Sequence, residues 1–233
     1  MAWFTSRRQP EPEVMDEPGE VEAYASSAAQ AYLNGVDNTF VEQVLDLNVA
    51  EGWALDVGAG PGSILLKIAE RSPGLKLMGV DRSPAMITYA RRSASAQGLT
   101  GRVNFCLADA VRLPFVDERF AIIWSNSVLH HLSDPAMAFS EISRVAKAGG
   151  VVLLRDLRRP SRLALAPHIA LYGRHYTGTM KRLYGDSVRA AYTRTEFEEM
   201  VRQSALAGAQ IFLHRRTHLG LAWKKKAGRL EFK

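Results

Sequence analysis

The chain has 233 residues, of which 47% are hydrophobic and 23% charged, so it is long and apolar enough to bury a core as one globular domain. It contains no apolar run close to the roughly 20 residues that span a bilayer and no signal-peptide apolar region, so we expect a cytoplasmic protein. A single cysteine, Cys106, excludes an internal disulfide, and no Cys/His group has metal-site spacing, so we expect no bound metal.

The positive charge is concentrated in the last third of the sequence. The net charge is +6, and residues 155–233 carry 17 basic against 6 acidic side chains. Such an excess is typical either of a solvated basic face or of a surface that attracts an anionic substrate, a nucleic acid or a lipid headgroup.

The first two thirds of the chain predict a leader followed by alternating helices and strands. Residues 1–20, rich in Pro and Glu, predict a disordered leader, and residues 21–233 a single domain. Helices are expected at 20–33, 38–49, 62–72, 83–98 and 134–149, and strands at 53–57, 75–80, 103–108, 120–125 and 150–157. Apolar strands separated by helices are typical of a parallel sheet covered on both faces, which is a doubly wound α/β fold.

After Leu157 the alternation is interrupted. Residues 158–192 predict a helical cap of two helices separated near Thr177 and Gly178. A helix at 193–208 follows, with Thr193 and Glu196 spaced as a capping box. Residues 209–223 predict two antiparallel strands, which complete a mostly parallel seven-stranded sheet.

The stretch LDVGAGPG, residues 55–62, places three glycines directly after the first predicted strand. Gly58, Gly60 and Gly62 allow the backbone to approach a nucleotide-like ligand where a Cβ would collide. The spacing is G-x-G-x-G instead of the G-x-G-x-x-G of dinucleotide binders, and the carboxylate of Asp56 beside it suits an ammonium or sulfonium better than a pyrophosphate. A nicotinamide dehydrogenase is therefore disfavoured.

Two further carboxylates follow the next two predicted strands. Asp81 is placed to accept hydrogen bonds from both ribose hydroxyls, and Asp109 to accept one from the exocyclic amine of adenine. The ends of parallel strands meet at one edge of the sheet, so these acids are expected in one site.

The segments LDVGAGPG, GVDRSPAMITYAR, ADAVRLPF and FAIIWSNSVLHHLSDPAMAFSEISRVAKAGGVVLL resemble, in order and spacing, the motifs of class I S-adenosylmethionine-dependent methyltransferases of the small-molecule type. The resemblance covers about residues 24–156 and implies S-adenosylmethionine as the cofactor. It implies that Gly58, Gly60 and the turn at Asp56 hold the methionine end, that Asp81 holds the ribose, and that Asp109 with Ala110 holds the adenine. The cofactor-binding residues expected on this basis are Asp56, Gly58, Ala59, Gly60, Gly62, Asp81, Arg82, Asp109, Ala110, Ser125 and Asn126.

Methyl transfer from a sulfonium requires mainly alignment and exclusion of water, with a general base where the nucleophile carries a proton. The catalytic candidates are Asn126, His130 and His131, which follow the fourth predicted strand. The resembled family often has a His here with a packing or hydrogen-bonding role, so that alternative remains open for both histidines.

The acceptor is expected to contact the N-terminal helix and the cap. The candidates are Tyr24, Tyr32, Arg155, Arg158, Arg159, His168, Tyr172 and Tyr176. If Arg158 and Arg159 point inward, they suit a carboxylate or phosphate, which favours a small, anionic acceptor. The alternatives are methylation of RNA or protein, for which no nucleic-acid module is recognisable, and a non-catalytic methyltransferase-like assembly protein.

Overall fold

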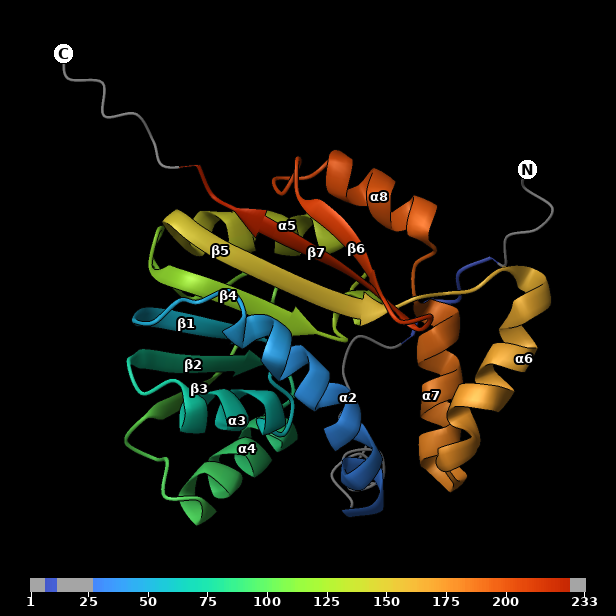
Figure 1. Ribbon diagram of the computed structural model, residues 1–233, viewed down its shortest axis with the longest axis horizontal. Coiled ribbons are helices and arrows are strands. Elements are labelled where there is room, and N and C mark those ends of the chain that lie inside the picture. The colour runs from blue at the N-terminus through green and yellow to red at the C-terminus, as the bar shows by residue number, and fades with distance from the viewer. Residues whose placement is uncertain (1–6, 12–26, 227–233) are drawn as a thin grey trace.

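A seven-stranded sheet in the order β3-β2-β1-β4-β5-β7-β6 forms the centre of the molecule (Figure 1). The computed structural model describes residues 7–11 and 27–226, with the side chains of 27–32 left out. β1 to β5 are parallel, and β7 pairs antiparallel with both β5 and β6. The strands are Gly52–Val57 (β1), Leu75–Asp81 (β2), Val103–Leu107 (β3), Phe120–Asn126 (β4), Ala146–Leu157 (β5), Gln210–His214 (β6) and His218–Lys224 (β7). The predicted doubly wound fold with an antiparallel C-terminal pair is confirmed.

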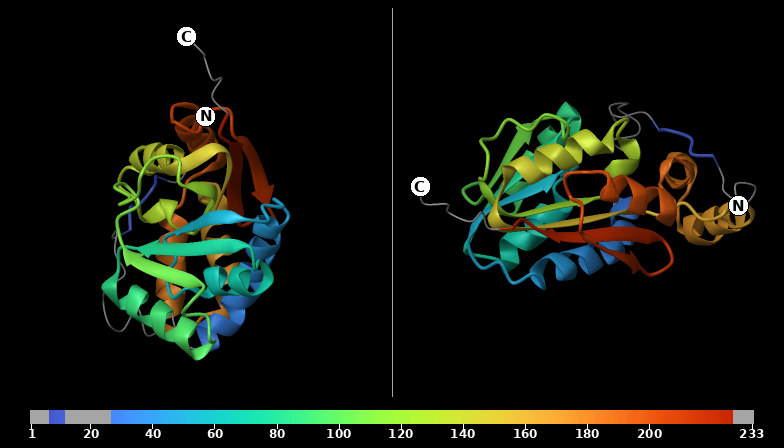
Figure 2. Two further views of the ribbon diagram at one scale, coloured as in Figure 1. Left: turned by 90° about the vertical axis from the view of Figure 1, so that its left-hand side faces the viewer. Right: turned by 90° about the horizontal axis from the view of Figure 1, so that it is seen from above.

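Helices cover both faces of the sheet (Figure 2). α2 (Ser27–Leu45), α3 (Ser63–Arg71) and α4 (Pro84–Ala96) pack on one face through an apolar cluster that includes Phe40, Leu65 and Ile87. α5 (Pro135–Val145) and α8 (Arg194–Arg202) pack on the other face through a second cluster. The central strands are buried on both sides, which explains why their sequences are apolar throughout.

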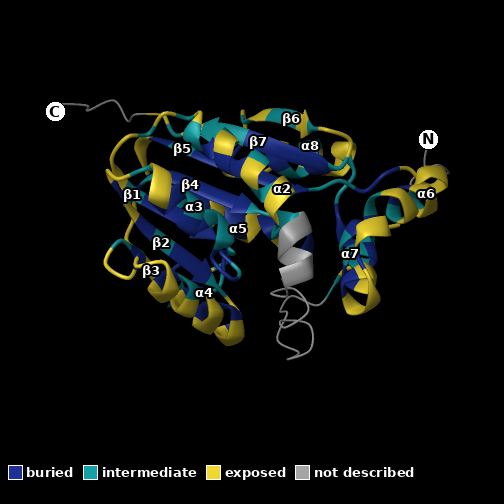
Figure 3. Ribbon diagram, turned by 60° about the horizontal axis from the view of Figure 1, so that its bottom comes forward, coloured by how far each residue is buried: buried dark blue, intermediate teal, exposed yellow. Residues whose placement is uncertain are grey.

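The cap lies beyond the carboxyl ends of the parallel strands, as Figure 1 shows. It consists of α6 (Arg162–Tyr172), the short 3-10 helix η3 (Gly173–His175) and α7 (Gly178–Ala190), so the predicted pair of helices with a break near Thr177 is present. α6 is largely exposed, whereas α7 buries one side against the body of the protein (Figure 3). No helix in the described part of the chain is long and apolar enough to cross a bilayer.

Three predicted boundaries are wrong. The helix expected at 193–208 is shorter, because α8 ends at Arg202. The expected break between N-terminal helices is absent, because α2 runs continuously through Gly35, and a single glycine costs a helix only about 1 kcal/mol. α5 ends at Val145 instead of Gly149, because Ala146 adopts extended backbone and pairs with Phe120 of β4. Residues 146–149 therefore extend β5.

A short part of the expected disordered leader has a defined place. Residues 7–11 lie against the C-terminal end of α7, where the N–H of Gln9 donates to the carbonyl of Arg189 at 3.1 Å. The guanidinium of Arg8 stacks on the ring of Tyr192, 4.5 Å from its centroid, and donates to the carbonyl of Ala190 at 2.6 Å. Arg8 and the N–H of Gln9 thus satisfy two carbonyls at the end of α7.

Candidate functional site

A cavity of about 450 Å³ opens where the strand order reverses between β1 and β4. The carboxyl ends of parallel strands carry ligand sites at such a switch point. Its walls come from the turn after β1, the ends of β2 and β4, the segment after β3, the 3-10 helix η2 (Leu129–His131), α2, α7 and the turn between β6 and β7. The cavity therefore lies between the sheet edge and the cap.

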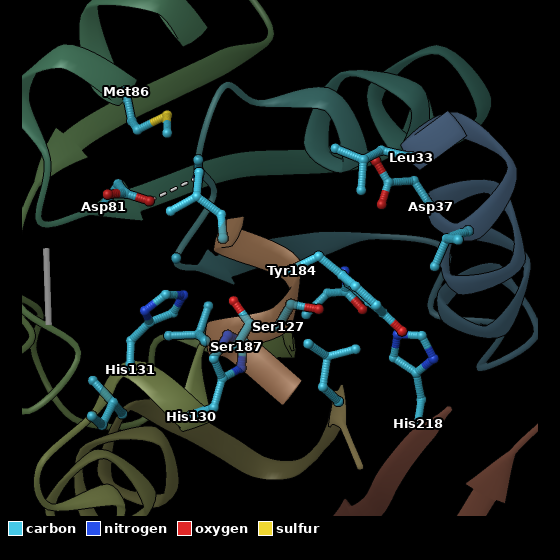
Figure 4. Close-up of a pocket in the computed structure, with 18 of the residues that line it drawn as sticks. Leu33, Asp37, Asp81, Met86, Ser127, His130, His131, Tyr184, Ser187 and His218 are labelled. Carbon is cyan, nitrogen blue, oxygen red and sulfur yellow. Dashed lines mark hydrogen bonds between the residues drawn. The ribbon is translucent and has the colours of Figure 1, made fainter. Parts of the chain in front are cut away.

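The glycine turn places backbone directly at the cavity wall. Gly58 has φ +75°, and a Cβ there would lie 2.2 Å from Cγ2 of Val128. Gly60 has φ +52°, lines the cavity, and has open space where its Cβ would be. The backbone N–H of Gly60 donates to Oδ2 of Asp81 at 2.8 Å, which ties the turn to the end of β2 (Figure 4). The turn leaves a cradle that a side chain at Gly60 would fill, as expected for a cofactor that contacts backbone.

Other predicted turn residues support the cradle from behind. A Cβ on Gly62 would lie 3.0 Å from Phe105 and 3.2 Å from Ala90, so this glycine permits close packing of α3 and α4. The Cβ of Ala59 fills the space over Gly79. Neither Gly62 nor Ala59 lines the cavity.

Asp81 and Asp109 both line the cavity, together with Arg82 and Ala110. Oδ1 of Asp81 accepts from the N–H of Ser83 at 2.9 Å, so hydrogen bonds fix both of its oxygens. Oδ1 of Asp109 accepts from the N–H of Val111 at 3.1 Å, and its Oδ2 lies 3.6 Å from Nε of Arg82. The strand ends thus bring together the two carboxylates that the sequence assigned to ribose and adenine.

A third acid, Asp56, lies beneath the turn and does not line the cavity. Burial raises the pKa of its carboxyl to about 7, and the nearby charges of Asp81 and Asp37 also raise it. The acid that does line the cavity on this side is Asp37, which comes from α2 (Figure 4). Burial raises the pKa of Asp37 to about 6, against the lowering effect of Lys67 and Arg155.

Side chains at the ends of β4 and β5 join β1, β4, β5 and α2. Oγ of Ser125 donates to the carbonyl of Val57 at 2.7 Å, so this side chain joins β4 to β1 and does not line the cavity. Asn126 lines the cavity, and its Oδ1 accepts from Nε of Arg155 at 2.8 Å. Arg155 also donates to Oγ1 of Thr39 at 2.9 Å and is buried under α2, outside the cavity lining.

The two histidine candidates line the cavity from η2. Nδ1 of His130 lies 2.5 Å from Oδ1 of Asp156, and the backbone N–H of His130 donates to Oδ2 at 3.0 Å. Burial by itself would lower the pKa of His130, but the carboxylate of Asp156 outweighs it and raises that pKa. The rings of His130 and His131 are 4.2 Å apart, and Oε2 of Glu11 lies 3.8 Å from Nε2 of His130 and 3.7 Å from Nδ1 of His131. Glu11 and Asp156 therefore face the histidines from two sides.

Of the five aromatic and histidine side chains predicted to contact the acceptor, two line the cavity. Tyr172 and Tyr176 line the cavity from the cap, and His168 packs its ring 4.6 Å from that of Tyr172 without lining it. Tyr24 lies outside the described residues, and for Tyr32 only the backbone position in α2 is described.

The arginines expected at the acceptor do not reach the cavity. Arg159 is buried, donates to both oxygens of Glu196 at 2.6 and 2.8 Å, and so ties the cap to α8. The backbone of Arg158 pairs with that of Tyr192 in an isolated β-bridge, and Arg158 does not line the cavity. The turn after β6 supplies Arg215 and Arg216 in their place.

Sequence reasoning missed Asp37, Arg215, Arg216 and His218, all of which line the cavity. The sequence did contain an indication for Arg215, Arg216 and His218. β7 is antiparallel to both β5 and β6, so β6 runs parallel to β5, and the turn after β6 lies at the same edge of the sheet as the end of β5. For Asp37 the sequence held no such signal, since the rotation of α2 over the sheet depends on the packing of its apolar side.

Comparison with known proteins agrees with the fold and the site. The methyltransferase domain family matches residues 50–229. A demethylmenaquinone methyltransferase of Thermus thermophilus is 34% identical over 128 residues, 54% of this chain and 57% of the relative. An ajmaline N-methyltransferase of Rauvolfia serpentina is 34% identical over 118 residues, 48% of this chain and 40% of the relative. The chain spans about half the length of the curated relatives it matches.

Solved structures share the fold at low identity. A SAM-dependent methyltransferase from Aquifex aeolicus has a TM-score of 0.64 and 18% identity, with 89% of this chain and 98% of that chain covered. Geranyl diphosphate C-methyltransferase from Streptomyces coelicolor has a TM-score of 0.63 and 15% identity, with 95% and 92% covered. The chain belongs to the methyltransferase domain family, in its class I, S-adenosylmethionine-dependent form.

Proposed function

We propose that the protein transfers a methyl group from S-adenosylmethionine to a small molecule that carries an anionic group. The observation that supports this most directly is the composition of one cavity, which joins the strand-end acids Asp81 and Asp109 to an apolar cap and to Arg215 and Arg216. On this proposal, the cofactor and the acceptor share one cavity that is partly open to solvent.

The cofactor is proposed to lie along the strand ends. Gly58 and Gly60 receive the methionine part, the oxygens of Asp81 accept from the ribose hydroxyls, and Asp109 with Ala110 receives the adenine. Four of the predicted cofactor residues are proposed to support the site without contacting the cofactor, because they pack or bond behind the turn and the sheet edge: Asp56, Ala59, Gly62 and Ser125. The carboxylate of Asp37 is proposed to face the cofactor's ammonium, since it lines the cavity on the side of the glycine turn.

S-adenosylmethionine supplies a carbon activated by the positive charge on sulfur. The protein's part is to align the acceptor with that carbon and to exclude water. Tyr172, Tyr176 and Tyr184 line the cap side of the cavity and would exclude water there. Asn126, His130 and His131 border the same space and are the polar groups proposed to contact the acceptor.

The acceptor is proposed to be small and anionic. The cap borders a cavity of about 450 Å³, and the named relatives from Thermus and Rauvolfia are methyltransferases of demethylmenaquinone and of ajmaline. Arg215 and Arg216 bring two guanidinium groups to the cavity, which suit a carboxylate or a phosphate.

A methyl-transfer assay tests the proposal. Labelled S-adenosylmethionine is incubated with the full chain and with fractionated small-molecule, RNA and protein extracts. We expect label in the anionic small-molecule fraction, and we expect the Arg215→Ala/Arg216→Ala variant to raise KM for the acceptor about tenfold or more, by loss of charge-assisted hydrogen bonds. Arg202→Ala, in an exposed ion pair on α8, is the control. Label only in RNA or protein, or a KM unchanged in the double variant, would contradict the anionic small-molecule acceptor.

A further inference from the structure

Three side chains from distant parts of the sequence converge beside the cavity. Glu11, His130 and His131 each bring one potential ligand atom within 4.8 Å of the other two, and Oε2 of Glu11 lies 3.8 Å from Nε2 of His130 and 3.7 Å from Nδ1 of His131. The side-chain exposures of Glu11, His130 and His131 are 7%, 2% and 21%, and both histidines line the cavity. Two imidazole nitrogens and one carboxylate oxygen are a ligand set that divalent transition metals bind, as in 2-His-1-carboxylate sites.

The fold holds each of these groups in a fixed orientation. Asp156 binds Nδ1 of His130 at 2.5 Å, which turns Nε2 toward Glu11. A carboxylate on the far nitrogen of a metal-ligating histidine is the usual outer-shell arrangement, because it sets the tautomer and raises the basicity of the ligand. Oγ of Ser187 donates to Oε1 of Glu11 at 3.3 Å, and this leaves Oε2 facing the histidines.

The segment that carries Glu11 is itself fastened to the site. Nη2 of Arg8 donates to the carbonyl of His130 at 2.9 Å, and its Nε donates to the carbonyl of Ala190 at 2.6 Å. Residues 7–11 thus place the carboxylate of Glu11 next to η2. This explains why the spacing of residues in the sequence did not predict a metal site.

The distances and charges both suit a divalent cation. An ion centred between three atoms with these separations lies about 2.4 Å or less from each, close to the roughly 2.0–2.2 Å of zinc bonds to nitrogen and oxygen. The carboxylates of Glu11 and Asp156 together outweigh the guanidinium of Arg8, which also acts on His130. With neutral imidazoles the group is left with net negative charge, which a divalent ion would neutralise.

We propose that Glu11, His130 and His131 form a binding site for a divalent transition metal ion, with its remaining coordination positions open to the cavity. Ion binding itself does not depend on the methyl transfer proposed above. Its role rests on that function: the ion would bind an oxygen of the acceptor and hold it toward the methyl group.

Metal retention tests the site. The full chain, without a polyhistidine tag, is dialysed with Zn²⁺, freed of excess metal and analysed for zinc, and Co²⁺ is added in parallel to follow the visible absorption of the bound ion. We expect one ion per chain in the wild type, none in Glu11→Gln or His131→Ala, and an affinity about 10–100-fold lower in Asp156→Asn. The matched controls His175→Ala and Glu198→Gln, in η3 and on the exposed side of α8, should retain the ion.

S-adenosylmethionine binding is measured on the same samples to separate the two proposals. If the folded wild type retains no ion, or if Glu11→Gln and His131→Ala retain as much as the wild type, the metal site is wrong even where the cofactor binds. Retention that is lost only in the ligand variants supports the site, whether or not methyl transfer is found.

Discussion

Gly58 and Gly60 sit in one turn but are glycines for different reasons. A Cβ at Gly58 would meet Val128 at 2.2 Å, whereas a Cβ at Gly60 would meet open cavity. We expect Gly58→Ala to lower the free energy of unfolding by about 1–3 kcal/mol through overpacking and strain. Gly60→Ala should lower the free energy of unfolding by about 1–2 kcal/mol, which is the strain of a non-glycine residue in the left-handed region. It should also weaken cofactor binding, because the added methyl group would occupy cavity space.

Urea unfolding and calorimetric titration of the two variants check this pair. The interpretation fails if Gly60→Ala binds S-adenosylmethionine as tightly as the wild type.

Asp56 is an acid whose ionised form the fold disfavours. Its folded pKa of about 7 lies above the ordinary value of 3.8, so it stabilises the fold when protonated, and this stabilisation is lost as pH rises from about 4 through 7. We expect Asp56→Asn to gain stability relative to the wild type between pH 5 and pH 8, by roughly 1.4 kcal/mol or more in unfolding free energy. Urea unfolding at each pH measures the difference. A difference that does not vary with pH would contradict this.

Asp37 should make cofactor binding depend on pH. Its pKa of about 6 means that it becomes neutral as pH falls below 6, and a neutral carboxyl loses its attraction for an ammonium. We expect the Kd for S-adenosylmethionine to rise about tenfold from pH 7.5 to pH 5 in the wild type, with a smaller change in Asp37→Asn. The exposed Asp46→Asn should behave like the wild type in the same titrations. Equal pH profiles in all three proteins would remove Asp37 from the cofactor site.

One buried arginine connects two strands and a helix. Arg155 of β5 binds Asn126 of β4 and Thr39 of α2, and its guanidinium lies 4.7 Å from the ring centroid of Phe40. Replacing Arg155 with Ala leaves these buried groups without their partner, so we expect a loss of about 3–5 kcal/mol in unfolding free energy. Arg194→Ala, in an exposed pair with Glu198, should cost about 1 kcal/mol or less. Denaturant unfolding compares the two, and equal losses would contradict the anchoring role.

The elements also show what local sequence determines. The capping box of α8 was predictable because Thr193 and Glu196 are local, and both of its hydrogen bonds are present. The end of α5 was not, because Ala146 leaves the helix to pair with Phe120 of another strand. Local chemistry therefore predicts starts and caps, while long-range strand pairing decides where neighbouring elements stop.

At the scale of the whole molecule, the strand order brings the site together. Asp81 and Asp109 were predictable as a pair because parallel strands end at one edge. Arg158 and Arg159 follow β5 at that same edge, yet Arg159 turns to Glu196 and the cavity receives Arg215 and Arg216 from the last hairpin. Strand order can be predicted from a sequence, whereas the direction of a long side chain is set by the partners that tertiary structure provides.

The cavity at the strand ends is expected to bind S-adenosylmethionine, and calorimetric titration with its product S-adenosylhomocysteine measures this site. We predict saturable binding to the full chain at one site, no comparable heat with NAD, and affinity reduced about 10–100-fold in Asp81→Asn, which loses a charged acceptor at the ribose and the turn. A folded protein that binds neither compound, or an Asp81→Asn variant with unchanged affinity, would show that the cofactor does not bind at the strand ends.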